Sequence, residues 1–189
     1  KVEAVICDSD NISWNDFDLL VIRSCWDYHL KIAKFVKFLD FIKSNNIKIL
    51  NTIETVKNNL DKKYLLGLEK EGIWIPKTIL IEEKSSLDLQ STLKTYSFDK
   101  VVIKPTISAS ADNTFLSSIK DIDLIQDKIK KILEKSGLLI QEFISEIQTQ
   151  GELSLIYFNK KYSHSVIKRP LKDDFRVQEK YGGKTSNTI

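Results

Sequence analysis

Residues 139–183, LIQEFISEIQTQGELSLIYFNKKYSHSVIKRPLKDDFRVQEKYGG, form the stretch of sequence that decides the fold of this chain. Three short apolar runs in and around it have the composition of β-strands: residues 138–143, 153–158 and 162–168. Asn159 and Lys160, between the second and third runs, are typical of a tight hairpin turn. The sequence therefore predicts antiparallel β-structure in the last third of the chain.

Charged side chains stand at the ends of these predicted strands. Glu152 opens the second run, Lys168 and Arg169 close the third before Pro170, and Arg176 follows. The planar guanidinium of arginine matches the oxygens of carboxylates and phosphates, and a carboxylate at a strand start can bind a pair of ribose hydroxyls. The alternative is a set of exposed charges that pair with one another.

An upstream run, residues 100–104, ends in Lys104 and is followed by the small-residue loop 108–114. A lysine ammonium is a compact charge that suits phosphate oxygens. The hydroxyls of Ser108 and Ser110 add donors, and small side chains let backbone N–H groups approach an anion. The loop contains no glycine, and a solvated lysine at a strand end is the alternative.

Two more segments are candidates for nucleotide contacts. Lys62 lies in the first turn of a predicted helix over residues 62–71, where its ammonium and the backbone amides can hold an anion; an exposed helix start is the alternative. An extended segment near residue 142 can present its backbone to an adenine edge, although an ordinary sheet strand is equally consistent. This segment consists of Gln141, Glu142, Phe143 and Ile144.

The first part of the chain alternates short apolar runs with helical patterns. Strands are predicted at residues 2–6, 19–22, 47–50 and 77–81, and helices at residues 32–42, 62–71, 87–96 and 122–135. Asp61 is the predicted N-cap of the helix over residues 62–71 and Gly72 its C-terminal stop. This order indicates an α/β front portion with parallel strands, followed by an α+β portion.

A polar and aromatic cluster follows the predicted strand over residues 19–22. Ligands of open α/β sheets gather outside the carboxyl ends of the strands, which makes Arg23, Ser24, Asp27 and Tyr28 candidates for binding a substrate. The alternative is an Arg23–Asp27 ion pair that caps the next helix.

Composition excludes several classes of function. The 189 residues carry a net charge of +3 without a polybasic run, which argues against nucleic-acid partners. No apolar stretch approaches the roughly 20 residues that span a bilayer, which argues against a membrane protein. Only two cysteines are present, so we expect a cytoplasmic protein without disulfides.

The order of these motifs resembles the ATP-grasp superfamily. Within it, the similarity is strongest to the glutathione synthetase-like carboxylate–amine ligases, in the branch that includes the ligase of D-cycloserine biosynthesis. The matching segments are VIRSCWDYH (21–29), LDKKYLLGLEKEGIWIPKT (60–78), VVIKPTISASADNTF (101–115), LLIQEF (138–143) and GELSLIYFNKKYSHSVIKRPLKDDFRVQEKYGG (151–183). The last segment is the most specific, because it is long and unusual.

The resemblance implies a role for each candidate residue. Lys62 and Lys104 are expected to bind ATP phosphates, with Ser108 and Ser110 in the mobile loop. The segment from Gln141 to Ile144 is expected to hold adenine, and Glu152 the ribose. Arg169 and Arg176 are expected to face the transferred phosphoryl group and the acyl substrate.

The resemblance also implies a domain plan and an incomplete fold. A partial pre-ATP-grasp domain is expected over residues 1–58, an N-terminal ATP-grasp subdomain over residues 59–140 and a partial C-terminal subdomain over residues 141–189. In this family the Mg²⁺ ligands lie on strands beyond the Gly182–Gly183 turn. We therefore expect those ligands beyond Ile189, no metal ligand within the chain, and a fold truncated at its C-terminal end that is inactive alone.

The leading functional hypothesis is an ATP-dependent ligase that joins a small, amino-acid-like carboxylate to an amine through an acylphosphate, with ATP and Mg²⁺ as cofactors. Dimers are common among the proteins of this family, so a homodimer is one expectation. The glycine-free loop motivates an alternative, a non-catalytic nucleotide-binding or partner-binding module on the same scaffold. A sugar- or polyphosphate-binding protein is a third reading, which leaves the 151–158 strand unexplained.

Overall fold

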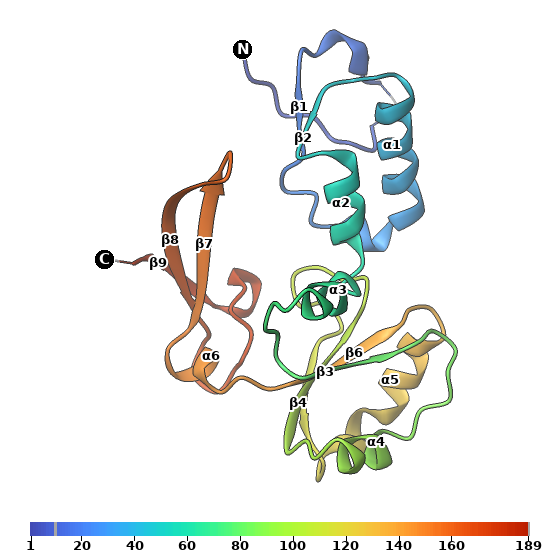
Figure 1. The fold of residues 1–189 in the computed structure, drawn as a ribbon, viewed down its shortest axis with the longest axis vertical. Helices are drawn as coiled ribbons and strands as arrows, with labels where there is room; N and C mark the ends of the chain where they lie inside the picture. The colour runs from blue at the N-terminus through green and yellow to red at the C-terminus, as the bar shows by residue number, and fades with distance from the viewer. Residues whose placement is uncertain (10, 189) are drawn as a thin grey trace. The chain divides into compact units, whose positions relative to one another are not determined.

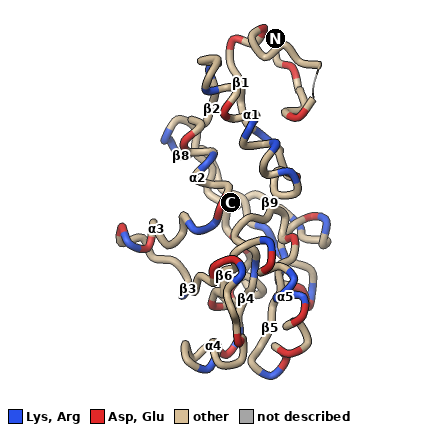
Figure 2. Tube along the Cα trace, turned by 90° about the vertical axis from the view of Figure 1, so that its right-hand side faces the viewer, with Lys and Arg blue, Asp and Glu red and all other residues tan. Residues whose placement is uncertain are grey.

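The computed structural model describes residues 1–9 and 11–188, which divide into two compact units. Unit 1 contains residues 1–73 and 106–109, and unit 2 contains residues 74–105 and the chain from Ser110 onward. Figure 1 shows the elements of each unit, and Figure 2 shows basic and acidic residues interspersed along the trace. The domain boundaries given above, after residues 58 and 140, stay predictions.

Unit 1 is built on a short parallel sheet. Strands β1 (Leu20–Val21) and β2 (Ile49–Leu50) pair in parallel, as the sequence predicts. Helices α1 (Ile32–Ser44), α2 (Ile53–Leu60) and α3 (Tyr64–Lys70) follow the strands, with 3-10 turns η1 (Trp14–Asp16) and η2 (Tyr28–Leu30). The apolar spacing of Phe35, Leu39 and Ile42 along α1 buries one helix face in the core of this unit.

Two local predictions for unit 1 are wrong. Residues 2–6 are not a strand: no neighbouring strand pairs with them among the described residues, and Val2 is 99% exposed. Asp61 does not cap α3, because the helix begins two residues later than predicted and the Asp61 carboxylate instead accepts the N–H of Lys63 at 2.9 Å. The predicted stop at Gly72 is confirmed, with φ 83° and its N–H donated to the Glu69 carbonyl.

The first sheet of unit 2 is antiparallel, with the strand order β3-β6-β4-β5. The strands are β3 (Thr78–Ile81), β4 (Lys100–Pro105), β5 (Phe115–Ser118) and β6 (Leu138–Glu142). Helices α4 (Leu89–Thr95) and α5 (Gln126–Leu133), with the 3-10 turn η3 (Ile122–Ile125), pack their apolar side chains against one face of this sheet (Figure 1). The opposite face is therefore where the polar side chains of the inner strands lie.

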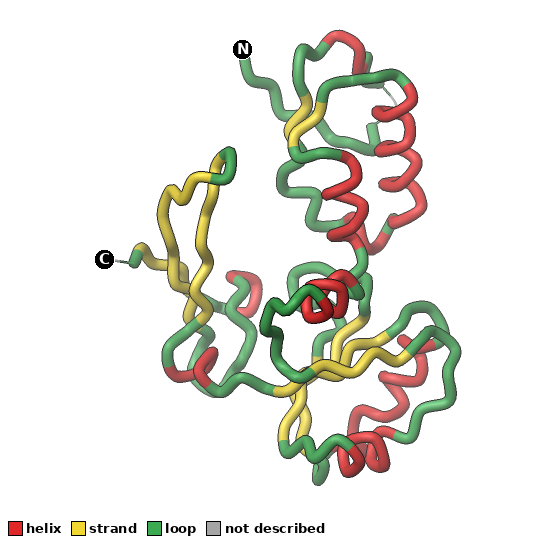
Figure 3. Tube along the Cα trace, viewed as in Figure 1, coloured by secondary structure: helices red, strands yellow, loops and turns green. Residues whose placement is uncertain are grey.

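A second sheet in unit 2 has the strand order β7-β8-β9, again antiparallel. Its strands are β7 (Glu152–Phe158), β8 (Lys161–Arg169) and β9 (Lys184–Asn187), accompanied by the short helix α6 (Glu146–Thr149) and the 3-10 turn η4 (Glu179–Tyr181). Figure 3 shows β7 and β8 as a long hairpin. Asn159 and Lys160 form its turn, as predicted, both with positive φ.

The predicted strand at residues 138–143 is antiparallel as expected but lies in the other sheet, between β3 and β4. The reason is its composition: Leu138, Leu139 and Ile140 are all fully buried, and a continuous apolar run suits a central strand covered on both faces. β7 instead alternates partly buried and exposed residues, as a strand with one covered face does.

Candidate functional site

Lys104 lies near the end of β4 on the sheet face opposite the helices. Side chains alternate along a strand, so Val101 and Ile103 enter the core and Lys104 points the other way, partly buried. Its Nζ donates to Oε1 of Gln141 on the neighbouring strand at 2.9 Å. Burial lowers the pKa of Lys104, and electrostatic attraction to Glu152 opposes that shift. The site thus holds an ammonium that is partly removed from water.

Glu152 opens β7 in direct register with Lys168 of β8, and the two side chains form an ion pair of 3.2 Å. Gly151 makes this start possible: its φ is 100°, and a Cβ there would lie 2.8 Å from the Lys168 carbonyl oxygen. Since Glu152 also interacts electrostatically with Lys104, the structure brings three of the predicted charged residues into one neighbourhood of unit 2.

The two candidate arginines differ in how firmly they are held. Arg176 binds Asp174 with both arms of its guanidinium, Nε to Oδ1 at 3.0 Å and Nη2 to Oδ2 at 2.8 Å, and lies 3.6 Å from the ring centre of Tyr181. Arg169 is exposed and donates to Ser186 Oγ at 3.2 Å. Arg176 is therefore the oriented cation, with guanidinium donors left over for an anion.

The hydrogen bond from Arg176 lowers the pKa of Asp174 to about 2. Asp174 also accepts the backbone N–H groups of Phe175 and Arg176 itself. The alternative given above, that these charges pair with one another, is therefore confirmed for Arg176. The sequence does not specify which of the neighbouring aspartates, Asp173 or Asp174, is its partner.

The backbone of the segment from Gln141 to Ile144 is largely engaged within its own sheet. The N–H of Glu142 donates to the Lys77 carbonyl and that of Phe143 to the Lys100 carbonyl, at 2.9 and 3.1 Å. Within the described chain the N–H of Ile144 has no hydrogen-bond partner. Of these three backbone N–H groups, the one of Ile144 is therefore left to donate a hydrogen bond to a ligand.

In unit 1, Lys62 and Ser108 are brought together although they are 46 residues apart. Lys62 Nζ donates to Ser108 Oγ at 2.9 Å and also to the Ser108 carbonyl, while the Lys62 N–H donates to the Thr106 carbonyl at 2.8 Å. Tyr28, a substrate candidate, donates its hydroxyl to the same Ser108 carbonyl at 3.3 Å. Burial raises the pKa of the Tyr28 hydroxyl.

The small-residue loop continues into unit 2 with a backbone that glycine would favour. Ser110, Ala111 and Asn113 have φ of 52°, 57° and 49°, in the left-handed region. That conformation costs residues with a Cβ roughly 1–2 kcal/mol, with Asn the least affected. The backbone of this loop therefore adopts positive φ values that favour glycine, although the loop contains no glycine.

The remaining substrate candidates lie on the exposed segment after β1. Arg23, Ser24 and Asp27 are all exposed, and the Asp27 carboxylate pairs with Lys31 at 3.3 Å rather than with Arg23. Lys31 also binds Asp8 at 3.0 Å, and this hydrogen bond lowers the pKa of Asp8. The Arg23–Asp27 cap considered above is wrong. The spacing of Asp27 and Lys31, one helical turn apart, is the signal that points to their pairing.

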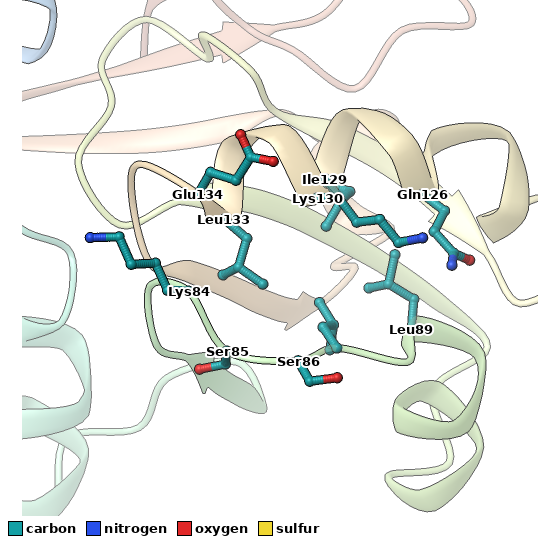
Figure 4. A pocket seen from close by; sticks show the side chains of 10 residues that line it. Lys84, Ser85, Ser86, Leu89, Gln126, Ile129, Lys130, Leu133 and Glu134 are labelled. Atoms are coloured by element: carbon teal, nitrogen blue, oxygen red, sulfur yellow. The ribbon is translucent and has the colours of Figure 1, made fainter.

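A cavity of about 350 Å³ lies on the helix side of the first sheet of unit 2 (Figure 4). Leu89, Ile129 and Leu133 line it together with Lys130 and Glu134. None of the candidate residues lines it.

Over residues 1–9 and 11–188, no helix is both long and apolar enough to cross a bilayer. In the same part of the chain, no three His, Cys, Asp or Glu side chains gather in a way that could hold a metal ion.

Comparisons with known proteins point to one fold. Residues 1–51 match the family model of the N-terminal domain of D-cycloserine synthetase DcsG. The cycloserine biosynthesis protein DcsG of Streptomyces lavendulae is 22% identical over 175 residues, which are 88% of this chain and 58% of that protein. The chain thus resembles an ATP-grasp ligase in sequence.

Solved structures agree. A crystal structure of D-cycloserine synthetase DcsG matches with a TM-score of 0.81 at 20% identity, covering 97% of this chain and 64% of that one. The D-alanine–D-alanine ligase of Bacillus anthracis matches with a TM-score of 0.65 at 18% identity, covering 92% and 55%. This chain therefore has part of an ATP-grasp fold, and it spans 64% or less of the length of these relatives.

Proposed function

We propose that this protein, whose fold is that of the ATP-grasp proteins, is an ATP-dependent ligase that joins a small, amino-acid-like carboxylate to an amine. The observation that carries the proposal is the group formed by Lys104, Glu152 and Lys168, with the partly buried Lys104 ammonium tied to Gln141. A cation held in a partly dehydrated place interacts more strongly with phosphate oxygens than one in bulk water. The name of one structural neighbour, the D-alanine–D-alanine ligase of Bacillus anthracis, agrees with this chemistry.

In this proposal each candidate residue has a defined task toward ATP. Lys104 and Lys62 neutralise phosphate oxygens, and the hydroxyls of Ser108 and Ser110 add hydrogen bonds. Glu152 accepts hydrogen bonds from the ribose hydroxyls.

The adenine ring is assigned to the segment that begins at Gln141 and Glu142. The edge of the adenine accepts a hydrogen bond from the N–H of Ile144, which no other group of the described chain uses. The side chain of Phe143 or Ile144 packs against the face of the ring.

The proposed reaction has two steps. A carboxylate oxygen of the substrate attacks the γ-phosphorus of ATP and ADP leaves, which gives an acylphosphate. An amine then attacks the acyl carbon, phosphate leaves and the nitrogen gives up a proton. Arg176 and Arg169 stabilise the negative charge on the transferred phosphoryl group, because preorganised donors are most effective where charge develops. The acyl substrate is assigned to Arg23, Ser24, Asp27 and Tyr28.

ATP is proposed to react as its Mg²⁺ complex, since phosphate oxygens commonly share Mg²⁺ with carboxylates of the protein. Over residues 1–9 and 11–188, no three His, Cys, Asp or Glu side chains gather in a way that could hold a metal ion. No residue of this chain is therefore assigned to the ion, and no step is assigned to it.

A second function is supported by one observation, the loop over residues 108–114, which adopts positive φ at three positions without containing glycine. In this alternative the scaffold binds ATP, or a partner, without catalysing ligation.

The test is ADP release by the purified full-length protein with Mg²⁺-ATP and pooled amino acids. We expect release that depends on the pool, and a loss on the order of 100-fold for Arg176→Ala, the size found for single stabilising donors. Lys172→Ala removes an exposed cation four residues away and should leave the rate unchanged. ATP binding without ADP release in any pool would favour the non-catalytic module, and equal effects of the two variants would remove Arg176 from the mechanism.

A further inference from the structure

A continuous chain of hydrogen bonds runs from Lys104 across the first sheet of unit 2. Lys104 Nζ contacts Gln141 Oε1 at 2.9 Å, Gln141 Nε2 contacts Thr78 Oγ1 at 2.8 Å, and Thr78 Oγ1 contacts the Pro76 carbonyl at 2.6 Å. The three side chains come from three adjacent strands and are all partly buried.

The register of the strands places these groups in line. Thr78 of β3 is the direct partner of Gln141 of β6, and Gln141 is in turn the partner of Val102 on β4. Because every second residue of a strand lies on the same face, Val102 and Lys104 share the face of Gln141 and Thr78. The chain of hydrogen bonds is therefore fixed by the sheet itself and not by mobile loops.

The chemistry of the groups fixes the direction of every bond. A lysine ammonium only donates, so the carboxamide must present its oxygen to Lys104 and its NH₂ group to Thr78. The Thr78 oxygen then accepts, and its own hydrogen must go to the Pro76 carbonyl, which only accepts. A carboxamide turned by 180° would place its NH₂ group against the Lys104 ammonium, so that two donors face each other, and its oxygen against the Thr78 oxygen, so that two acceptors face each other.

We infer that Thr78 is a positioning residue that locks the Gln141 carboxamide with its oxygen toward Lys104, and so holds the Lys104 ammonium in place for a nucleotide phosphate. The last clause rests on the function proposed above; the lock itself rests on the hydrogen bonds alone. Thr78 acts through Gln141 and needs no contact with the ligand.

The orientation of the Gln141 carboxamide affects the charge state of Lys104. Burial already lowers its pKa, and Glu152 is the charged group that opposes the shift. The aligned Gln141 oxygen adds a second stabilising partner for the charged form. Loss of the lock lets the carboxamide rotate, removes that partner for part of the time, and lowers the pKa of Lys104 further.

The test compares Thr78→Val, which keeps the shape but cannot accept or donate, with Thr78→Ser, which keeps the hydroxyl. The pKa of Lys104 is measured in the full-length protein by NMR titration of ¹³C-labelled lysine side chains, with Lys104→Arg identifying the signal. We expect a clear fall of the Lys104 pKa in Thr78→Val and the wild-type value in Thr78→Ser. ATP affinity, measured by calorimetry, should fall on the order of tenfold in Thr78→Val only.

A double variant distinguishes the effect of Thr78 on the orientation of the Gln141 carboxamide from its effect on the stability of the fold. In Gln141→Glu both side-chain oxygens accept, so adding Thr78→Val should change the Lys104 pKa much less than it does in the wild type. An unchanged Lys104 pKa in folded Thr78→Val would overturn the lock, as would an equal fall in Thr78→Ser. If Thr78→Val alone does not fold, the comparison is made between Gln141→Glu and the double variant, and a clear fall of the Lys104 pKa in the double variant decides against the lock. If the wild type does not bind ATP but the variants show the predicted changes in the Lys104 pKa, the proposed ligand is wrong and the lock stands.

Discussion

Asp174 and Arg176 illustrate how single residues prepare this surface for an anion. The carboxylate of Asp174 holds the guanidinium by two hydrogen bonds while Tyr181 lies against its plane. An arginine held in this way loses less side-chain entropy when it binds a phosphate than a mobile one does. The same contacts stabilise the fold, which gives the pair a measurable signature that does not depend on any ligand.

Replacing Asp174 by Asn should lower the free energy of unfolding by about 1–2 kcal/mol at pH 7. The folded-state pKa of Asp174 is about 2, below the ordinary 3.8, because Arg176 and two backbone N–H groups stabilise its ionised form. That contribution is fully present above pH 3.8 and is lost as the pH falls toward 2. Urea unfolding at pH 7 and pH 3 measures the difference.

Asp173→Asn is the matched control, since Asp173 is exposed and its φ of 67° is one that Asn also tolerates. A loss in Asp174→Asn that equals the loss in Asp173→Asn, or that does not shrink at low pH, would contradict this account of the pair.

Among the elements, the β7–β8 hairpin has a turn in which one residue adopts an unfavourable backbone conformation. Asn159 and Lys160 both have positive φ, 47° and 63°, the signature of a type I′ turn that matches strand twist. Asn tolerates this conformation, whereas for a lysine the steric contact of its Cβ makes it unfavourable in free energy. The long hairpin therefore forms in spite of one strained position.

Lys160→Gly should raise the free energy of unfolding by about 1 kcal/mol, because glycine adopts positive φ without strain. Lys161→Gly, at the first residue of β8 and also exposed, should lower it by about 0.5 kcal/mol, since glycine is unfavourable in strands. Thermal or urea unfolding of the two variants provides the test. Destabilisation by both variants would mean that position 160 is not strained.

The elements that sequence inspection predicts are those with strong local patterns. β4 and β6 are continuous apolar runs, α1 has helical spacing, and the turn at Asn159 has a characteristic residue pair. β5 and β9, with sequences FLSS and KTSN, escape notice because short polar strands carry no alternation. The strand predicted at residues 2–6 is wrong because an apolar composition does not ensure that a neighbouring strand is there to pair with.

The candidate residues are less predictable than the elements that carry them. The Lys104–Gln141 hydrogen bond joins residues 37 positions apart, and it depends on the register of β4 against β6, which no local pattern specifies. The role of Thr78 depends on the same register. The pairing of Asp174 with Arg176 is local, and closer attention to short-range charge pairs can find it.

At the scale of the whole molecule, the ATP-grasp fold and the charged group around Lys104 lead to one central claim, that the protein binds ATP through Lys104. A ligand that binds only the folded state stabilises it by about 2.7 kcal/mol at a concentration of roughly 100 times its Kd. Lys104→Ala removes the claimed contact. Lys120→Ala removes an exposed lysine of the same unit and serves as the control.

The most direct measurement is the thermal unfolding of the full-length protein with and without Mg²⁺-ATP. We predict a rise of several degrees in the Tm for the wild type and for Lys120→Ala, and no rise for Lys104→Ala. A folded wild-type protein whose Tm does not respond to Mg²⁺-ATP, or a Lys104→Ala variant that responds as the wild type does, would contradict the claim.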